Sequence, residues 1–265
     1  MGLSIICFLW PHPHSSFAKG GATLKVISYN LGPLWKKEVL VSLIRDQEAD
    51  IIFLQEVGSI KKLKEVAEVL KYDFLPKPSG SKHSDVAILS KFPLKLKKEF
   101  TLIGWPKGRQ TAICALANIK NKAVLLSSLH LKNIFLNKSK SAELTASKAK
   151  LLGIGLRETF LDNYRSKGII QFLSKIKNLR YDCAIIGGDF NSLPFSKAIR
   201  KMRSVFNDCS WMNKTMFQST VKYKCCFLPI KVDYIFCSKG LEYSDTQIIK
   251  ISQGDHYPII TNIAF

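Results

Sequence analysis

Residues 183–191 read Cys-Ala-Ile-Ile-Gly-Gly-Asp-Phe-Asn, a short apolar run that stops at two glycines. The run has no helical period, so it predicts a buried strand that ends abruptly. Glycine at positions 187 and 188 lets another group or a substrate phosphate approach the backbone, and residues two apart project the same way in extended chain. Asp189 and Asn191 are therefore predicted to lie side by side, although Gly-Gly-Asp alone is equally compatible with a simple turn.

Polar residues also lie at the ends of five other strand-like runs. They are Asn30, Glu56, His130, Asp233 and the pair Asp255 and His256. Each alone has an ordinary explanation, as a turn residue, a surface carboxylate or a structural histidine. Together they form a set of hard oxygen donors with two histidines and no cysteine, which suits Mg²⁺, with Mn²⁺ or Ca²⁺ as alternatives.

The periodicity of the rest of the chain predicts a mixed α/β protein. Helices are predicted over 36–48, 60–70, 151–179 with an interruption near Gly168, and 195–202. Further strands are predicted over 86–90, and over 111–119 and 123–129 as a hairpin, while 132–148 reads as a loop and 205–230 as irregular chain. The basic stretch 94–109, which includes Trp105, and the stretch 211–231 are candidate walls of a substrate groove.

Charge and length limit the classes of function. The chain has 265 residues, of which 46% are apolar, and 40 Lys and Arg against 20 Asp and Glu give a net charge of +20. That length and composition suit one α/β domain over 24–265, and the charge favours polyanionic partners such as nucleic acid over a merely soluble basic surface. The seven cysteines show no spacing typical of a zinc site, so several are expected to be buried thiols.

The first 18 residues read as a candidate signal peptide. An apolar block over 3–10 is followed by small residues at positions 16 and 18, which suit cleavage after Ala18. No Lys or Arg precedes the apolar block, so a leader without export function stays open. The expected location is therefore secreted or periplasmic, with the cytoplasm as the alternative.

The ordered motifs resemble those of the endonuclease/exonuclease/phosphatase superfamily, and its deoxyribonuclease I-like nucleases in particular. The similarity runs over about 24–265. The residues that carry it are Ser28-Tyr29-Asn30, Leu54-Gln55-Glu56, Val86-Ala87-Ile88-Leu89-Ser90, Leu129-His130, Gly188-Asp189-Phe190-Asn191, Val232-Asp233-Tyr234-Ile235 and Gly254-Asp255-His256-Tyr257-Pro258. The resemblance implies a four-layer α/β fold, in which a two-sheet β-sandwich is flanked by helices and the active site lies where strand ends of both sheets meet.

The resemblance also implies residue roles. Asn30, Glu56 and Asp255 would form the metal site, and Asp255 could instead join the histidine network. Asp189 would orient or deprotonate the attacking water. The remaining roles are phosphate binding and charge stabilisation by His130 and His256, a phosphate-oxygen contact by Asn191, orientation of a histidine by Asp233, and a phosphate grip by Arg109.

These expectations predict a metal-dependent phosphodiesterase. The leading hypothesis is a DNA endonuclease of low sequence specificity that uses an activated water and acts as a monomer without an obligate protein partner. Two departures from related patterns bear on it: Gly32 replaces the acid of many abasic-site repair enzymes, and Lys231-Val232-Asp233-Tyr234 differs from the inositol-phosphatase motif. A sphingomyelinase-like lipid-headgroup phosphodiesterase and a catalytically idle nucleic-acid-binding module remain alternatives.

Overall fold

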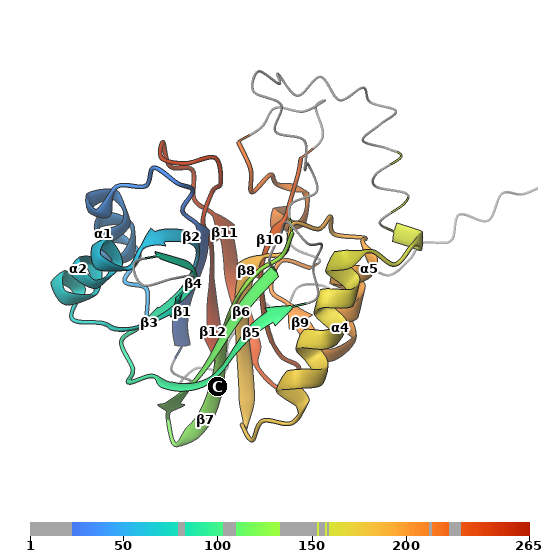
Figure 1. Ribbon diagram of the computed structural model, residues 1–265, viewed down its shortest axis with the longest axis horizontal. Helices are drawn as coiled ribbons and strands as arrows, with labels where there is room; N and C mark the ends of the chain where they lie inside the picture. The colour runs from blue at the N-terminus through green and yellow to red at the C-terminus, as the bar shows by residue number, and fades with distance from the viewer. Residues whose placement is uncertain are drawn as a thin grey trace, which may run out of the picture.

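The computed structural model describes residues 23–78, 83–102, 110–132, 153, 157, 159–211, 214–222 and 229–265. Two mixed six-stranded sheets pack face to face, and helices cover their outer faces (Figure 1). The first sheet has the order β11 (Glu242–Ile248), β12 (Ile259–Ala264), β1 (Thr23–Asn30), β2 (Ile51–Ser59), β4 (His83–Ser90), β3 (Asp73–Pro78). The second has the order β5 (Lys95–Leu102), β6 (Gln110–Ile119), β7 (Lys122–His130), β8 (Cys183–Asp189), β10 (Asp233–Ser238), β9 (Phe206–Asp208).

Three apolar layers hold these elements together. The first sheet is covered by α1 (Lys37–Asp46) and α2 (Ile60–Leu70), and the second by α4 (Tyr164–Lys177) and α5 (Lys197–Val205). Successive side chains of a strand point to opposite faces. In β1, Val26 therefore packs between the sheets, whereas Ile27 packs beneath the helices. The predicted four-layer α/β fold is confirmed.

The two glycines of β8 allow close packing at the centre of the sandwich. A Cβ on Gly187 would lie 2.3 Å from the ring of Phe53 in the other sheet, and one on Gly188 would lie 2.3 Å from the carbonyl oxygen of Leu129. Real Cβ atoms do not approach other atoms so closely. The predicted close approach to the backbone is confirmed, and the groups that approach are Phe53 and Leu129.

Strand direction brings the polar strand ends to one edge of the sandwich. β1 runs parallel to β2, and β7 runs parallel to β8, so each pair ends at the same edge. Within the second sheet, His130 lies opposite Asp189 across β7 and β8, and Asp233 lies opposite Asp189 across β8 and β10. The fold thus places three predicted site residues in one row.

Several sequence predictions need correction. Helix α4 continues through Gly168, where a Cβ would lie 2.9 Å from the side-chain nitrogen of Gln110, so this glycine serves packing and does not interrupt the helix. Four strands were not predicted, namely β3, β5, β9 and β11, and all four are sheet edges. The 205–230 region also contains a short 3₁₀ helix, η1 (Lys214–Phe217).

The described cysteines are reduced and buried, and the described helices are too short or too polar to span a membrane. Cys114, Cys183, Cys209 and Cys237 are buried free thiols, as expected. None of the helices in the described ranges is long and apolar enough to cross a membrane. The predicted signal peptide and most of the predicted 132–148 loop lie outside the described residues.

Candidate active site

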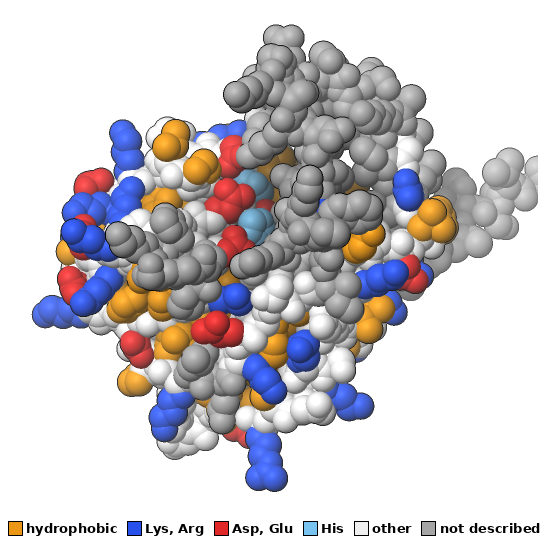
Figure 2. Space-filling model, viewed as in Figure 1, with side chains coloured by type: hydrophobic (Ala, Val, Ile, Leu, Met, Phe, Trp, Pro, Cys, Tyr) orange, Lys and Arg blue, Asp and Glu red, His pale blue; other side chains and the backbone are white. Residues whose placement is uncertain are grey.

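The polar strand ends of both sheets meet in one cluster, where acidic and histidine side chains lie together at the surface (Figure 2). The cluster joins the sheets directly, because the Asn30 side-chain nitrogen on β1 donates to Asp189 Oδ2 on β8 over 3.0 Å. A second link lies just below it, where Gln55 Nε2 donates to Ser128 Oγ over 3.1 Å. The predicted residues that the structure brings together are Asn30, Glu56, His130, Asp189, Asn191, Asp233 and His256.

Asp189 is the centre of the cluster. Its Oδ1 accepts the backbone N–H of Asn191 over 2.8 Å, and its Oδ2 accepts the Asn191 side-chain nitrogen over 2.9 Å. The side chain is almost fully buried. Burial, together with the negative charge of Asp233, raises the pKa of Asp189 to about 6. This carboxylate can therefore gain and lose a proton near neutral pH.

His256 forms the first of two histidine–aspartate pairs. Its Nδ1 lies 2.9 Å from Asp233 Oδ2, and its Nε2 lies 3.9 Å from Asp189 Oδ2. Burial alone would lower the pKa of His256, but the charge of Asp233 outweighs it and raises the pKa to about 10. The imidazole is thus a cation at neutral pH, with Nε2 directed at Asp189.

His130 forms the second pair with Asp85, a residue that the sequence analysis did not single out. His130 Nδ1 lies 2.8 Å from Asp85 Oδ1, and Nε2 lies 3.7 Å from Asp189 Oδ2 and 3.9 Å from Glu56 Oε1. Burial lowers the pKa of His130, yet the charge of Asp85 raises it to about 9. Asp85 comes just before the predicted strand 86–90, and a carboxylate beside a buried run in a chain with few acids was the available signal.

Two residues of the site have left-handed backbone conformations that non-glycine residues seldom adopt. Glu56 has φ 50° and Asn191 has φ 45°. Glu56 lies where the pairing of β2 and β4 shifts register, so a bulge redirects its side chain, which is 40% exposed. Strain of this kind costs about 1–3 kcal/mol per residue and concentrates at functional sites.

Asn30 lies beside Glu56, and Asp255 lies against the loop that follows Asn30. The Asn30 side-chain nitrogen is 3.3 Å from Glu56 Oε1, while its oxygen accepts the backbone N–H of Gly32 over 3.1 Å. That N–H fixes the orientation of the amide, which therefore holds carboxylates through its nitrogen. A Cβ on Gly32 would lie 3.3 Å from Asp255 Oδ1, so the Asp255 carboxylate lies against this loop.

The residues present fit a hard divalent cation. Asp189, Asp233 and His256 offer ligand atoms that all lie within 4.8 Å of one another, and Asp233 Oδ1 is buried with no hydrogen-bond partner among the described residues. His256 would first have to lose the proton that Asp233 stabilises. The exposed carboxylate of Glu56 has no such requirement, and it is the better candidate to hold the ion.

The residues predicted to grip phosphate or to line a substrate groove are not part of the described cluster. Arg109 and Trp105 lie outside the described residues. Lys231 is 1% exposed and donates to the backbone oxygen of Asp233 over 2.9 Å, so it cannot line a groove. Arg165, which was not anticipated, is buried at the start of α4 and donates to the backbone oxygen of Lys132 over 3.3 Å. Burial lowers the pKa of Arg165 to about 10, although the charge of Asp189 opposes that shift.

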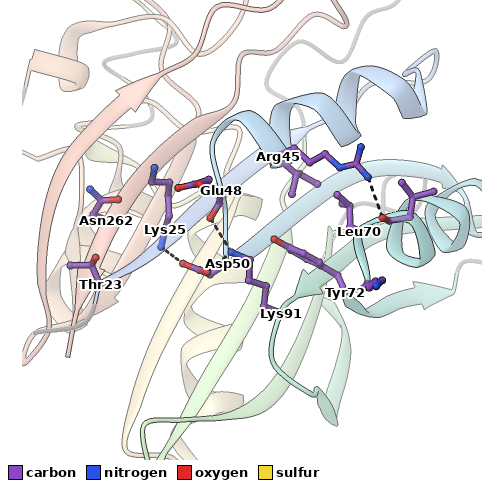
Figure 3. Close-up of a pocket in the computed structure, with 12 residues that line it drawn as sticks. Thr23, Lys25, Arg45, Glu48, Asp50, Leu70, Tyr72, Lys91 and Asn262 are labelled. Carbon is purple, nitrogen blue, oxygen red and sulfur yellow. Dashed lines mark hydrogen bonds and ion pairs between the residues drawn. The ribbon is translucent and has the colours of Figure 1, made fainter.

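A large surface pocket of about 820 Å³ lies away from this cluster (Figure 3). Thr23 and Lys25 line it at the start of β1, whereas Asn30 lies at the other end of the same strand. Its acidic and basic groups are mixed, and the ion pair of Lys91 with Asp50, at 2.8 Å, lies within it (Figure 3). The pocket contains none of the predicted site residues, so we assign the chemistry to the strand-end cluster.

The chain belongs to the endonuclease/exonuclease/phosphatase family, whose model matches residues 30–256. Enzymes of this family are phosphoesterases that depend on divalent metal ions. The search of curated proteins found no match.

Solved structures show the same fold. Danio rerio TDP2 in complex with a single-strand DNA product has 16% identity and a TM-score of 0.64, covering 91% of this chain and 99% of that one. The human Nocturnin catalytic domain with a bound sulfate anion has 18% identity and a TM-score of 0.64, covering 92% and 93%. The mannosyl-6-phosphatase of Bacteroides thetaiotaomicron has 19% identity and a TM-score of 0.60, covering 91% and 100%.

Proposed function

We propose that this protein is a divalent-metal-dependent phosphodiesterase that cleaves nucleic acid, with DNA as its main substrate and low sequence specificity. One observation carries the proposal. The Nε2 atoms of His130 and His256 lie 3.7 and 3.9 Å from the same oxygen of Asp189, and each ring is held at Nδ1 by a carboxylate. Two fixed cations around one base suit a phosphodiester anion that is attacked by water.

Asp189 and the two histidines have different roles in proton transfer. With a pKa of about 6, Asp189 is mostly ionised at neutral pH and can take a proton from the attacking water. His256 keeps its proton throughout the working range, and we assign it to a phosphate oxygen. His130 is the more exposed of the two rings, and we assign it to the leaving oxygen, to which it donates its Nε2 proton.

The metal belongs at the mouth of the cluster. We propose that Glu56 holds it, with Asp255 beside it and Asn30 fixing the Glu56 carboxylate. A bound divalent cation supplies positive charge against the phosphate oxygens and so stabilises the transition state. The Asn191 side-chain nitrogen donates hydrogen bonds to Asp189 Oδ2 and to the backbone oxygen of Leu131, so it fixes the Asp189 carboxylate in place.

The choice of nucleic acid rests on charge. A net charge of +20 favours a polymer of phosphates, because neutralising several phosphates at once gives strong binding that is independent of sequence. The relative crystallised with a single-strand DNA product agrees with such a substrate. We also propose that the protein is exported and works as a monomer, the former on the pattern of residues 1–18 alone.

The test is incubation of the purified protein with supercoiled plasmid. We expect nicking in the presence of Mg²⁺ and none after addition of EDTA or in the Asp189→Asn variant. Hydrolysis of sphingomyelin vesicles with an intact plasmid would instead support a lipid substrate. Binding of DNA without any cleavage would support an inactive binding module, and either result would refute the proposal.

A further inference from the structure

The tip of the loop between β1 and α1 is apolar and exposed. Pro33 and Leu34 form the turn at this tip, and both are exposed. Leu34 is 89% exposed, the highest value among the large apolar side chains of the described residues. A single exposed leucine is common on protein surfaces and requires no functional explanation by itself. The way the loop is held, and where it lies, are what distinguish this one.

The loop is fixed on both sides of its tip. Trp35, next to Leu34, is 3% exposed and donates its indole N–H to the backbone oxygen of Val57 over 2.7 Å. The Lys62 ammonium donates to the Trp35 backbone oxygen and lies 4.4 Å above its ring. On the N-terminal side of the tip, the Leu31 backbone N–H donates to the backbone oxygen of Gln55 over 2.9 Å. The tip is therefore presented by a rigid base.

The same contacts place the tip beside the catalytic cluster. Val57, which holds Trp35, follows Glu56, and the Lys36 backbone N–H donates to Gln253 Oε1 over 2.6 Å, two residues before Asp255. Two residues of extended chain span at most about 7 Å, so Leu34 is within that distance of Gly32, which packs against Asp255. Exposed hydrophobic side chains lie next to the acidic and histidine cluster in Figure 2.

We propose that Pro33 and Leu34 form an apolar wedge that contacts a nucleic-acid base beside the scissile phosphate. This inference rests on the proposed nuclease function and adds a substrate-contacting element to it. Proline and leucine are among the residues that proteins insert between base steps, where they partly unstack the bases. A preorganised wedge suits this task, because little ordering entropy is lost when it engages its substrate.

The experiment compares a polymer with a small substrate. Wild-type protein, Leu34→Asp and Leu34→Met are assayed on duplex DNA and on bis(p-nitrophenyl) phosphate, which has no neighbouring base. We expect Leu34→Asp to lower the ratio of DNA cleavage to small-diester hydrolysis about tenfold, because a charged side chain does not insert between stacked bases, and we expect Leu34→Met to keep the wild-type ratio. The matched control is Val69→Asp, since Val69 is 55% exposed on the rim of the distant pocket, and it should leave the ratio unchanged.

A second readout tests the contact itself. Duplex DNA that carries 2-aminopurine should gain fluorescence when it binds the Asp189→Asn protein, because the wedge unstacks the base. The double variant Asp189→Asn, Leu34→Asp should bind the DNA without this gain. An unchanged ratio, an equal fall on both substrates, or an effect confined to sphingomyelin vesicles would overturn the wedge. Wild-type protein that hydrolyses the small diester but never cuts DNA would refute the nuclease function as well, so the two failures are distinguishable.

Discussion

The two histidine–aspartate pairs reach the same oxygen of Asp189, but the sheets contribute to them in opposite ways. In the pair of Asp85 and His130 the acid comes from the first sheet and the imidazole from the second. In the pair of Asp233 and His256 the acid comes from the second sheet, and the imidazole precedes β12 of the first. Each pair therefore forms only when the two sheets pack correctly.

The pairs also differ in how deeply their side chains are buried. The side chains of His256 and Asp233 are 10% and 1% exposed, against 17% and 26% for His130 and Asp85. The more buried imidazole has the higher pKa, about 10 against about 9, since its acid partner acts in a less screened environment. The same chemical unit thus yields a buried cation at neutral pH on one side and a more accessible proton donor on the other.

Removing Asp189, whose Oδ2 both histidines approach, should have the largest effect on activity. Asp189→Asn keeps the size of the side chain but removes the base, so we expect the rate of phosphodiester cleavage to fall by about 10⁴-fold. Single-turnover cleavage of a labelled DNA duplex would measure it, with Glu68→Gln, an exposed acid on α2, as the control. A variant that keeps a tenth of the activity would show that Asp189 is not the base.

Removing one imidazole at a time should reveal the difference between the pairs. We expect His256→Ala to lower kcat about 10³-fold and His130→Ala about 10²-fold, because the buried cation is the harder to replace with water. A leaving group of low pKa should restore much of the His130→Ala activity and little of the His256→Ala activity. Equal losses and equal restoration would contradict the division of roles.

Asp189 and Asp85 should determine the pH dependence of the activity. Activity needs ionised Asp189 and protonated imidazoles, so it should fall as pH decreases through about 6 and as pH increases through about 9. Asp85→Asn removes the largest charge that raises the pKa of His130. Burial is then opposed only by the charges of Asp189 and Glu56, so the upper limb should move to lower pH. We expect a loss of roughly 10- to 100-fold at the optimum, the value of a hydrogen bond to a charged group.

The matched change Asp233→Asn sharpens the contrast. This substitution removes the charge that raises the pKa of His256, so that pKa should fall. It should also lower the pKa of Asp189, because the negative charge of Asp233 opposes ionisation of Asp189. Both limbs of the pH profile of kcat/KM should therefore move down in Asp233→Asn, whereas only the upper limb should move in Asp85→Asn. An upper limb that stays near pH 9 in the Asp85→Asn protein would break the proposed link between Asp85 and His130.

The sequence predicted the central strands well and missed every edge. Buried on both faces, the central strands are continuous apolar runs, as in 183–186, which periodicity recognises. Edge strands have no such run. β3 contains Pro76 and Pro78, and β5 contains three lysines, the devices by which edge strands avoid pairing with other chains.

The site was predictable where a motif contained both its chemistry and its strand. Asp233 and His256 lie in recognisable motifs, but no local pattern indicates that Asp85, 45 residues before His130, contacts that histidine. That contact depends on the packing of one sheet on the other, which strand periodicity does not specify. For the same reason Gly168 was misread as a helix break, since the side chain that fills its space comes from Gln110 on another element.

The smallest expected effect concerns a contact that only one pair has. The Thr111 hydroxyl donates to Asp85 Oδ2, whereas Oδ1 of Asp233 has no hydrogen-bond partner within the described chain. Thr111→Val removes the donor with little change of shape, so Asp85 should hold His130 less firmly and kcat should fall about threefold. Thr101→Val, at an exposed position of β5, is the control. Because the contact is absent from the other pair, the loss should vanish in an Asp85→Asn background and persist in an Asp233→Asn background. A loss that persists in both would assign Thr111 to the packing of β6 and remove it from the site.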